Sequence, residues 1–82
     1  MIDYSRLRSV TARRLDAALL ADGFVFRRQT GSHRRYAHAD GRRVTLTVHH
    51  WSDTFRPGTL RSMIEFQARW TEEPLQRLGL LP

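Results

Sequence analysis

The stretch that decides the fold covers residues 33–49 and reads HRRYAHADGRRVTLTVH. In its second half, apolar residues at 44, 46 and 48 alternate with threonines at 45 and 47. A period of two is typical of a β-strand with one buried face. Ala39-Asp40-Gly41 reads as a turn with glycine where a left-handed residue is needed. We therefore predict an antiparallel hairpin of residues 33–38 and 42–49.

Upstream of this hairpin the sequence predicts a helix and a further strand. Apolar residues recur at helical spacing over residues 11–22, and Gly23 supplies a stop; an earlier start at Ser5 or Ser9 stays open. Residues 24–29 alternate, with Phe24, Phe26 and Arg28 on one face, and Thr30-Gly31-Ser32 is a turn. This strand and the hairpin make a three-stranded meander.

Two helices are expected downstream of the meander. Pro57-Gly58-Thr59 introduces the first, with Thr59 as its N-cap. One side of this helix carries Leu60, Met63, Ile64 and Gln67. Thr71 caps a short third helix, and its apolar stripe contains Leu75, Leu78, Leu80 and Leu81, joined by Trp70. We expect this helix to enlarge a small core; a dimer contact or the docking of a partner protein are the alternatives.

The predicted fold class is α+β: helix, three-stranded antiparallel meander, helix, and a short C-terminal helix. We expect one domain over residues 1–82, with a core at 11–68, an N-terminal arm at 1–10 and a C-terminal extension at 69–82.

The register of the hairpin decides which residues face the helices. If the turn holds three residues with a glycine bulge, His38 pairs with Arg42 and Tyr36 lies opposite Val44 on the buried face. His33 and Arg35 then occupy the open face. A two-residue turn would reverse this arrangement, and we prefer the bulge because tyrosine is a better core residue than arginine.

Composition limits the classes of protein. The net charge is +6, so we expect a polyanionic partner such as nucleic acid. All 14 basic residues are arginine, which reflects either codon composition or a preference for bidentate phosphate contacts. The absence of cysteine excludes disulfides and thiolate metal sites and fits a reducing compartment. No apolar run approaches the roughly 20 residues of a membrane span, and the first residues do not resemble a signal peptide. We expect a cytoplasmic protein without a membrane association.

His33 is the residue with the clearest chemical potential. It follows a turn glycine and lies close to Arg27, Arg28, Arg34 and Arg35. An imidazole titrates near neutral pH and a guanidinium suits phosphate, so the cluster indicates acid/base chemistry on a phosphodiester. A surface histidine at the start of a strand is the alternative interpretation.

Several short motifs, in this order, resemble the HicA family of mRNA interferase toxins. They are Gly23-Phe24, Gly31-Ser32-His33 followed by Tyr36, Gly41-Arg42-Arg43-Val44-Thr45, a histidine that ends the third strand, and Gly58-Thr59-Leu60-Arg61-Ser62. The resemblance spans about residues 11–68 and identifies the chain as a long form, because the arm and the extension lie outside it. It implies a fold like the double-stranded RNA-binding domain, cleavage of mRNA, neutralisation by a HicB-like antitoxin, and His33 as the catalytic histidine.

Ribonuclease chemistry needs a base, an acid and cations around the phosphate. We assign His33 as the general acid or base, and Arg35 and Arg27 to the phosphate. His49 and His50 are candidates for a second acid/base group, since the end of the third strand lies beside the start of the second. Candidate RNA-binding residues are Arg27, Arg28, Gly31, Ser32, Arg34 and Arg35. Trp51 and Phe55 either stack on bases or cover the core.

The sequence indicates no cofactor and no metal site. The eight acidic residues are dispersed, and adjacent histidines in a strand diverge instead of converging on one ion. The function predicted first is therefore a metal-independent endoribonuclease toxin acting on mRNA. The alternatives are a non-catalytic RNA-binding module of the same fold and an interaction domain for an acidic protein.

Overall fold

The computed structural model describes residues 1–82 and has the predicted α+β order of elements. The order is η1 (Tyr4–Leu7), α1 (Ala12–Ala21), β1 (Val25–Thr30), β2 (His33–Ala37), β3 (Arg43–Thr47), α2 (Pro57–Arg61), its π-helical continuation η2 (Ser62–Gln67), and α3 (Glu72–Arg77). The strands form one antiparallel sheet in the order β1-β2-β3. The helix, meander, helix arrangement and the short third helix are confirmed.

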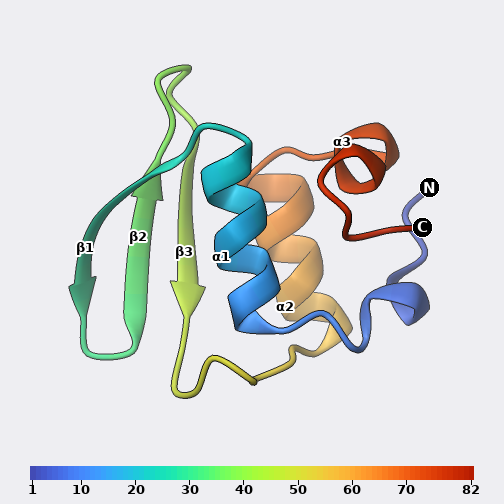
Figure 1. Cartoon of the computed structure of the whole chain (residues 1–82), viewed down its shortest axis with the longest axis horizontal. Coiled ribbons are helices and arrows are strands. Elements are labelled where there is room, and N and C mark those ends of the chain that lie inside the picture. Colours follow the sequence, from blue (N-terminus) through green and yellow to red (C-terminus); the bar gives the residue numbers. More distant parts are fainter.

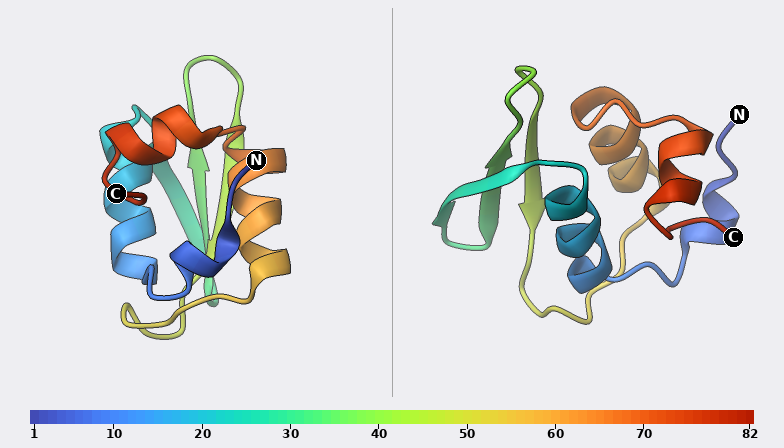
Figure 2. Two further views of the ribbon diagram at one scale, coloured as in Figure 1. Left: turned by 90° about the vertical axis from the view of Figure 1, so that its right-hand side faces the viewer. Right: turned by 45° about the horizontal axis from the view of Figure 1, so that its top comes forward.

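The elements are stacked in layers on one side of the sheet. Helices α1 and α2 lie side by side against one face, as both views of Figure 2 show. Helix α3 and the N-terminal η1 pack on the far side of this helix pair, so both chain ends lie away from the strands (Figure 1). The opposite face of the sheet carries no covering element.

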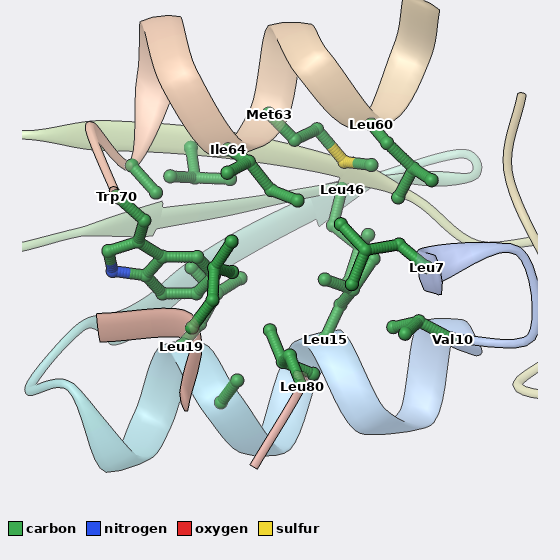
Figure 3. Packing of buried hydrophobic residues seen from close by; sticks show 14 of the residues in the cluster. Leu7, Val10, Leu15, Leu19, Leu46, Leu60, Met63, Ile64, Trp70 and Leu80 are labelled. Carbon is green, nitrogen blue, oxygen red and sulfur yellow. The ribbon is translucent and has the colours of Figure 1, made fainter. Parts of the chain in front are cut away.

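The core fills the space between the sheet, the helix pair and the outer layer (Figure 3). All 19 buried residues are apolar or aromatic, and no buried polar side-chain atom lacks a hydrogen-bond partner. The sheet contributes Tyr36, Val44 and Leu46 on its covered face. The predicted apolar sides of the helices are buried as well: Leu15, Ala18 and Leu19 on α1, Leu60, Met63 and Ile64 on α2 and η2.

The bulged register of the β2–β3 hairpin is confirmed. The His38 amide donates to the Arg42 carbonyl at 2.9 Å, and Tyr36 pairs with Val44. Gly41 has φ +98°, a left-handed conformation that L side chains rarely adopt. Tyr36 is consequently 1% exposed, while His33 pairs with Thr47 on the other face.

The prediction for the first strand was wrong in its second half. A β-bulge interrupts the pairing between Phe26 and Arg28, so the simple alternation of residues 24–29 stops at Arg27. Arg28 pairs with Arg35 and turns to the open face instead of sharing the face of Phe26. One extra residue on one strand changes the parity of everything after it.

The predicted start of the second helix is wrong, whereas that of the first helix is confirmed. Thr59 is not the N-cap of the second helix, because α2 begins at Pro57 with Arg56 as its cap residue. Proline suits the first helical position, since its fixed φ is helical and its missing N–H would be unpaired there. The first helix has no early start: Thr11 caps α1, and the arm forms the separate η1 turn.

The C-terminal extension packs on the domain, as the sequence predicts. Leu75, Leu80 and Leu81 are buried, and Leu78 is half-buried against the same cluster. The carboxylate of Asp22, at the end of α1, anchors this extension. It accepts hydrogen bonds from the Trp70 indole at 2.9 Å and from the Arg77 guanidinium at 3.4 Å.

Asp22 also joins the extension to the β2–β3 turn. Its carboxylate pairs with Arg42 at 3.1 Å, and the same guanidinium donates to the Ala68 carbonyl at 2.6 Å. Burial favours the neutral acid, but hydrogen bonds from Trp70, Arg77 and Arg42 outweigh it and lower the pKa of Asp22. The ionised carboxylate therefore stabilises the folded state.

We expect Asp22→Asn to lower the free energy of unfolding at pH 7 by about 2 kcal/mol, because it removes the carboxylate shared by Arg77 and the enclosed Arg42, which keeps only its pair with Asp40. A group with a lowered folded pKa contributes stability above its unfolded pKa, about 4, and loses it as the pH falls through the folded value. Urea unfolding at pH 7 and in acid should show the difference from wild type shrinking in acid. Glu73→Gln, at an exposed pair with Arg77, is the control and should change stability little. Equal effects of the two variants would contradict the role of Asp22.

Candidate functional site

The open face of the sheet presents three cross-strand rows of side chains. The first contains Thr30, His33 and Thr47; the second Arg28, Arg35 and Thr45; the third Val25, Ala37 and Arg43. The strands contain no acidic residue. This face is therefore polar and strongly basic, in contrast to the apolar face under the helices.

His33 lies at the end of this face where β2 begins. The β1–β2 loop consists of Gly31 and Ser32, because Thr30 already pairs with His33. Gly31 has φ +58°, as expected for the first position of a tight hairpin turn, and a side chain there would meet only open space. The imidazole of His33 is exposed and has no hydrogen-bond partner within the protein, so both ring nitrogens are accessible to a ligand.

His49 and His50 follow β3 in a loop tied to the start of α1. Their backbone amides donate to the Asp53 carboxylate at 3.1 and 3.0 Å. These hydrogen bonds, first that from His50, lower the pKa of Asp53. The backbone carbonyls of Asp53 and Trp51 accept hydrogen bonds from the backbone amides of Ala12 and Arg13. These amides lie in the first turn of α1, where N–H groups have no partner within the helix.

This loop brings the two histidines near the turn that precedes His33. The Val48 amide donates to the Ser32 carbonyl at 2.7 Å, so the chain after β3 runs beside the β1–β2 loop. Both imidazoles are exposed, and neither forms a hydrogen bond with His33. The fourth histidine, His38, is structural: its Nε2 lies 2.9 Å from the Asp22 carbonyl and its ring meets Phe24 edge-on.

Arg34 is separated from the other arginines of the motif. Its guanidinium carbon lies 4.2 Å from the Phe26 ring centre and 4.9 Å from that of Trp51. Its nitrogens donate to the Tyr36 hydroxyl and the Gln29 amide oxygen, each at 2.9 Å. The structure thus places Arg34 on the covered side, where it braces Tyr36 and the loop after β3.

The Tyr36 hydroxyl is held as a neutral hydrogen-bond donor. It donates to the Asp16 carboxylate on α1. Burial, followed by this carboxylate, raises the pKa of Tyr36 to about 12, although the Arg34 guanidinium opposes the shift. The hydroxyl therefore stays protonated at neutral pH and does not act as a base.

Four arginines of the open face have no partner: Arg27, Arg28, Arg35 and Arg43 form no ion pair or side-chain hydrogen bond. The sequence predicted Arg27, Arg28 and Arg35 as RNA-binding residues but did not indicate Arg43. Its parity with Thr45 and Thr47 was the available signal, because residues two apart in a strand share a face.

Trp51 and Phe55 both cover the edge of the core. Trp51 is stacked by Arg34 and lies 5.9 Å from the Arg13 guanidinium carbon, and Phe55 packs against the buried cluster. No group of three or more histidine, aspartate or glutamate side chains is arranged to hold a metal ion. No helix has the length and hydropathy needed to cross a lipid bilayer.

Comparison with protein families assigns the chain to one family. The model of the HicA toxin of bacterial toxin-antitoxin systems matches residues 12–68, from the start of α1 to the end of η2. This match covers well over half of the chain, and the protein belongs to the HicA toxin family. It is therefore the toxin of a toxin-antitoxin pair. No curated protein sequence matches the chain. The matched region contains the whole sheet and its open face, whereas η1 and α3 lie outside it.

We expect Arg34→Lys to lower the free energy of unfolding by about 1–2 kcal/mol, because lysine loses the planar stacking and the fork of hydrogen bonds. Arg35→Lys, the neighbouring residue on the open face, should change stability by less than about 0.5 kcal/mol. Chemical denaturation followed by circular dichroism measures both. Equal stability of the two variants would show that Arg34 does not brace the fold.

Proposed function

We propose that this toxin is a metal-independent endoribonuclease that cleaves mRNA, with His33 as its general acid/base. The observation that carries this proposal is the position of His33. Its exposed and unpartnered imidazole stands on a basic sheet face, one row from the paired Arg28 and Arg35. Membership of a toxin family supports a destructive activity, and the net charge of +6 supports a polyanionic substrate.

The chemistry uses the nucleophile that RNA itself carries. His33 removes the proton from a ribose 2′-hydroxyl, and the 2′-oxygen forms a bond to the adjacent phosphorus. The bond from phosphorus to the 5′-oxygen breaks, and that oxygen takes up a proton, leaving a 2′,3′-cyclic phosphate and a free 5′-hydroxyl. Guanidinium groups of Arg35 and Arg28 stabilise the negative charge that develops on the phosphorane oxygens.

The sheet face is suited to a single strand of RNA. Gly31 and Ser32 border His33, and the open space beside Gly31 lets a nucleotide backbone approach closely. Arg34 supports this surface from beneath by fixing Tyr36, and it does so without contacting phosphate. A HicB-like antitoxin is the proposed protein partner that neutralises the toxin.

We expect His33→Ala to remain folded and to lose cleavage of a defined mRNA, measured in EDTA with purified protein. Removal of an acid/base group should slow cleavage by about 10²–10⁴-fold. The substitution removes an exposed side chain, so the thermal unfolding curve should be almost unchanged. Full cleavage by the variant would overturn the proposal. Wild-type cleavage that is lost in EDTA and returns only with added magnesium would overturn it as well. RNA binding without cleavage by the wild-type protein would favour a non-catalytic RNA-binding module.

We propose His49 over His50 as the second acid/base group, because His49 continues the parity of Thr45 and Thr47 on the open face. His49→Ala should lower the cleavage rate by about 10²-fold and remove one limb of the pH–rate profile. His50→Ala should lower the rate less and keep both limbs. A wild-type profile for His49→Ala would show that His33 acts with a proton donor from elsewhere.

A further inference from the structure

The open sheet face is hollowed at the end opposite His33. A depression of about 350 Å³ lies there, and its charged lining consists of Arg27, Arg28, Arg35 and Arg43. Ala37 forms the floor, because this small residue stands between Val25 and Arg43 in the third row. We call this feature the bulge depression, since the β1 bulge at Arg27 forms one of its sides.

The bulge is the reason that these arginines meet. Without it, two consecutive residues of a strand would point to opposite faces. The extra residue at Arg27 lets both Arg27 and Arg28 line the same depression. Arg35 lies opposite Arg28, and Arg43 enters from β3 on the other side.

The four guanidinium groups leave an uncompensated positive charge. None of them pairs with a carboxylate, although other arginines of the chain do so with Asp16, Asp22 and Asp40. Like charges held close together repel, and an anion bound between them removes this repulsion. Guanidinium groups match the geometry of phosphate oxygens and can bind them in pairs.

The bulge depression extends beyond the site of cleavage, although Arg28 and Arg35 line the depression and also face the cleaved phosphate. Ala37 lies four residues along β2 from His33, a distance of about 13 Å in a strand. One phosphate group is too small to contact both ends of this span. The two positions therefore require two different phosphates, and Arg35 stands between them in the middle row.

We propose that the bulge depression binds a second backbone phosphate of the same RNA strand, displaced along the strand from the phosphate that is cleaved. This proposal rests on the proposed ribonuclease function and adds a subsite to it. The RNA strand would run along β2 from His33 to Ala37. Its cleaved phosphate would lie at His33, and a second phosphate in the bulge depression would fix its position. An acidic protein segment fits less well, because arginines dominate the lining and Val25, 55% exposed beside Ala37, is the one exposed apolar side chain at its edge, whereas protein interfaces are anchored by several.

The test measures binding of a fluorescent single-stranded RNA oligonucleotide to full-length His33→Ala protein in EDTA, by anisotropy at several salt concentrations. Two further substitutions are added separately. Arg43→Gln removes one charge from the depression, and Ala37→Leu fills its floor without changing any charge. Arg8→Gln is the matched control, because Arg8 is exposed in the N-terminal arm and forms no ion pair.

We expect Arg43→Gln and Ala37→Leu each to weaken RNA binding on the order of tenfold. Arg43→Gln should also reduce the slope of log K against log salt by about 0.7, the value for one phosphate contact on a single strand. Arg8→Gln should change affinity by less than about twofold. RNA binding by the depression variants equal to that of the Arg8 control would overturn the subsite.

A second measurement locates the phosphate. Uncharged methylphosphonate linkages are placed one at a time along the oligonucleotide. A methylphosphonate at one linkage other than the cleaved one should weaken binding of the oligonucleotide to the His33→Ala protein. The same modification should cause no additional loss of binding to protein that carries both His33→Ala and Arg43→Gln. Sensitivity confined to the cleaved linkage would overturn the proposal.

The outcomes separate the subsite from the proposed chemistry. Weakened RNA binding by both depression variants, together with full cleavage by His33→Ala alone, would reject the catalytic role and retain the subsite. Loss of cleavage in His33→Ala with unchanged binding in the depression variants would do the reverse. If the depression variants lose binding to an acidic antitoxin but bind RNA as well as the control, the depression belongs to a protein partner and the proposal is overturned. Arg43→Gln alters only an exposed side chain, so it keeps the test valid if Ala37→Leu fails to fold.

Discussion

The hydrogen bond between His38 and Arg42 across a three-residue turn sets the side of the sheet on which every β2 residue lies. A slip of one residue would exchange the two faces of β2, exposing Tyr36 and burying His33. Gly41, with φ +98°, makes this turn possible. The turn is also fixed from outside, since His38 contacts the Asp22 carbonyl and Arg42 pairs with the Asp22 carboxylate. The proposed active face therefore depends on an ion pair at the opposite end of the strand.

Asp22 connects this turn to the segments outside the family match. Trp70 and Arg77 bind the same carboxylate, while Leu7 and Leu75 are completely buried between η1, α3 and the helix pair. The arm and the extension thus form a third layer that enlarges the core of a small domain, where burial is otherwise limited. This layer lies on the side of α1 and α2 that faces away from the sheet (Figure 2), and it leaves the opposite face of the sheet open.

The arginines of the chain divide into two kinds by their surroundings. Arg34 and Arg42 are largely enclosed, pair with carboxylates and stack on aromatic rings, so they act as parts of the core edge. The four arginines around the bulge depression have no such partners and remain unpaired at the surface. Arg34 and Arg35 are adjacent in the sequence, yet they fall into different kinds because neighbouring residues of a strand face opposite sides. A count of basic residues near His33 does not separate the two kinds. Position relative to buried Tyr36 does, because Arg34, two residues away, shares its face and Arg35, one residue away, lies on the opposite face.

The sequence by itself determined the α+β order, the bulged turn at residues 39–41, the covered face of β2 and β3, and the apolar stripe of the extension. These features depend on local periodicity and turn chemistry, which neighbouring residues specify. Only the tertiary structure decided the bulge at Arg27, the structural role of Arg34, the start of α2 at Pro57, and the place of Arg43 beside Ala37. Each of these depends on what lies across a strand or against a helix, and such partners are distant in the chain. The proposed subsite belongs to this second group, because its four charges come from three different strands.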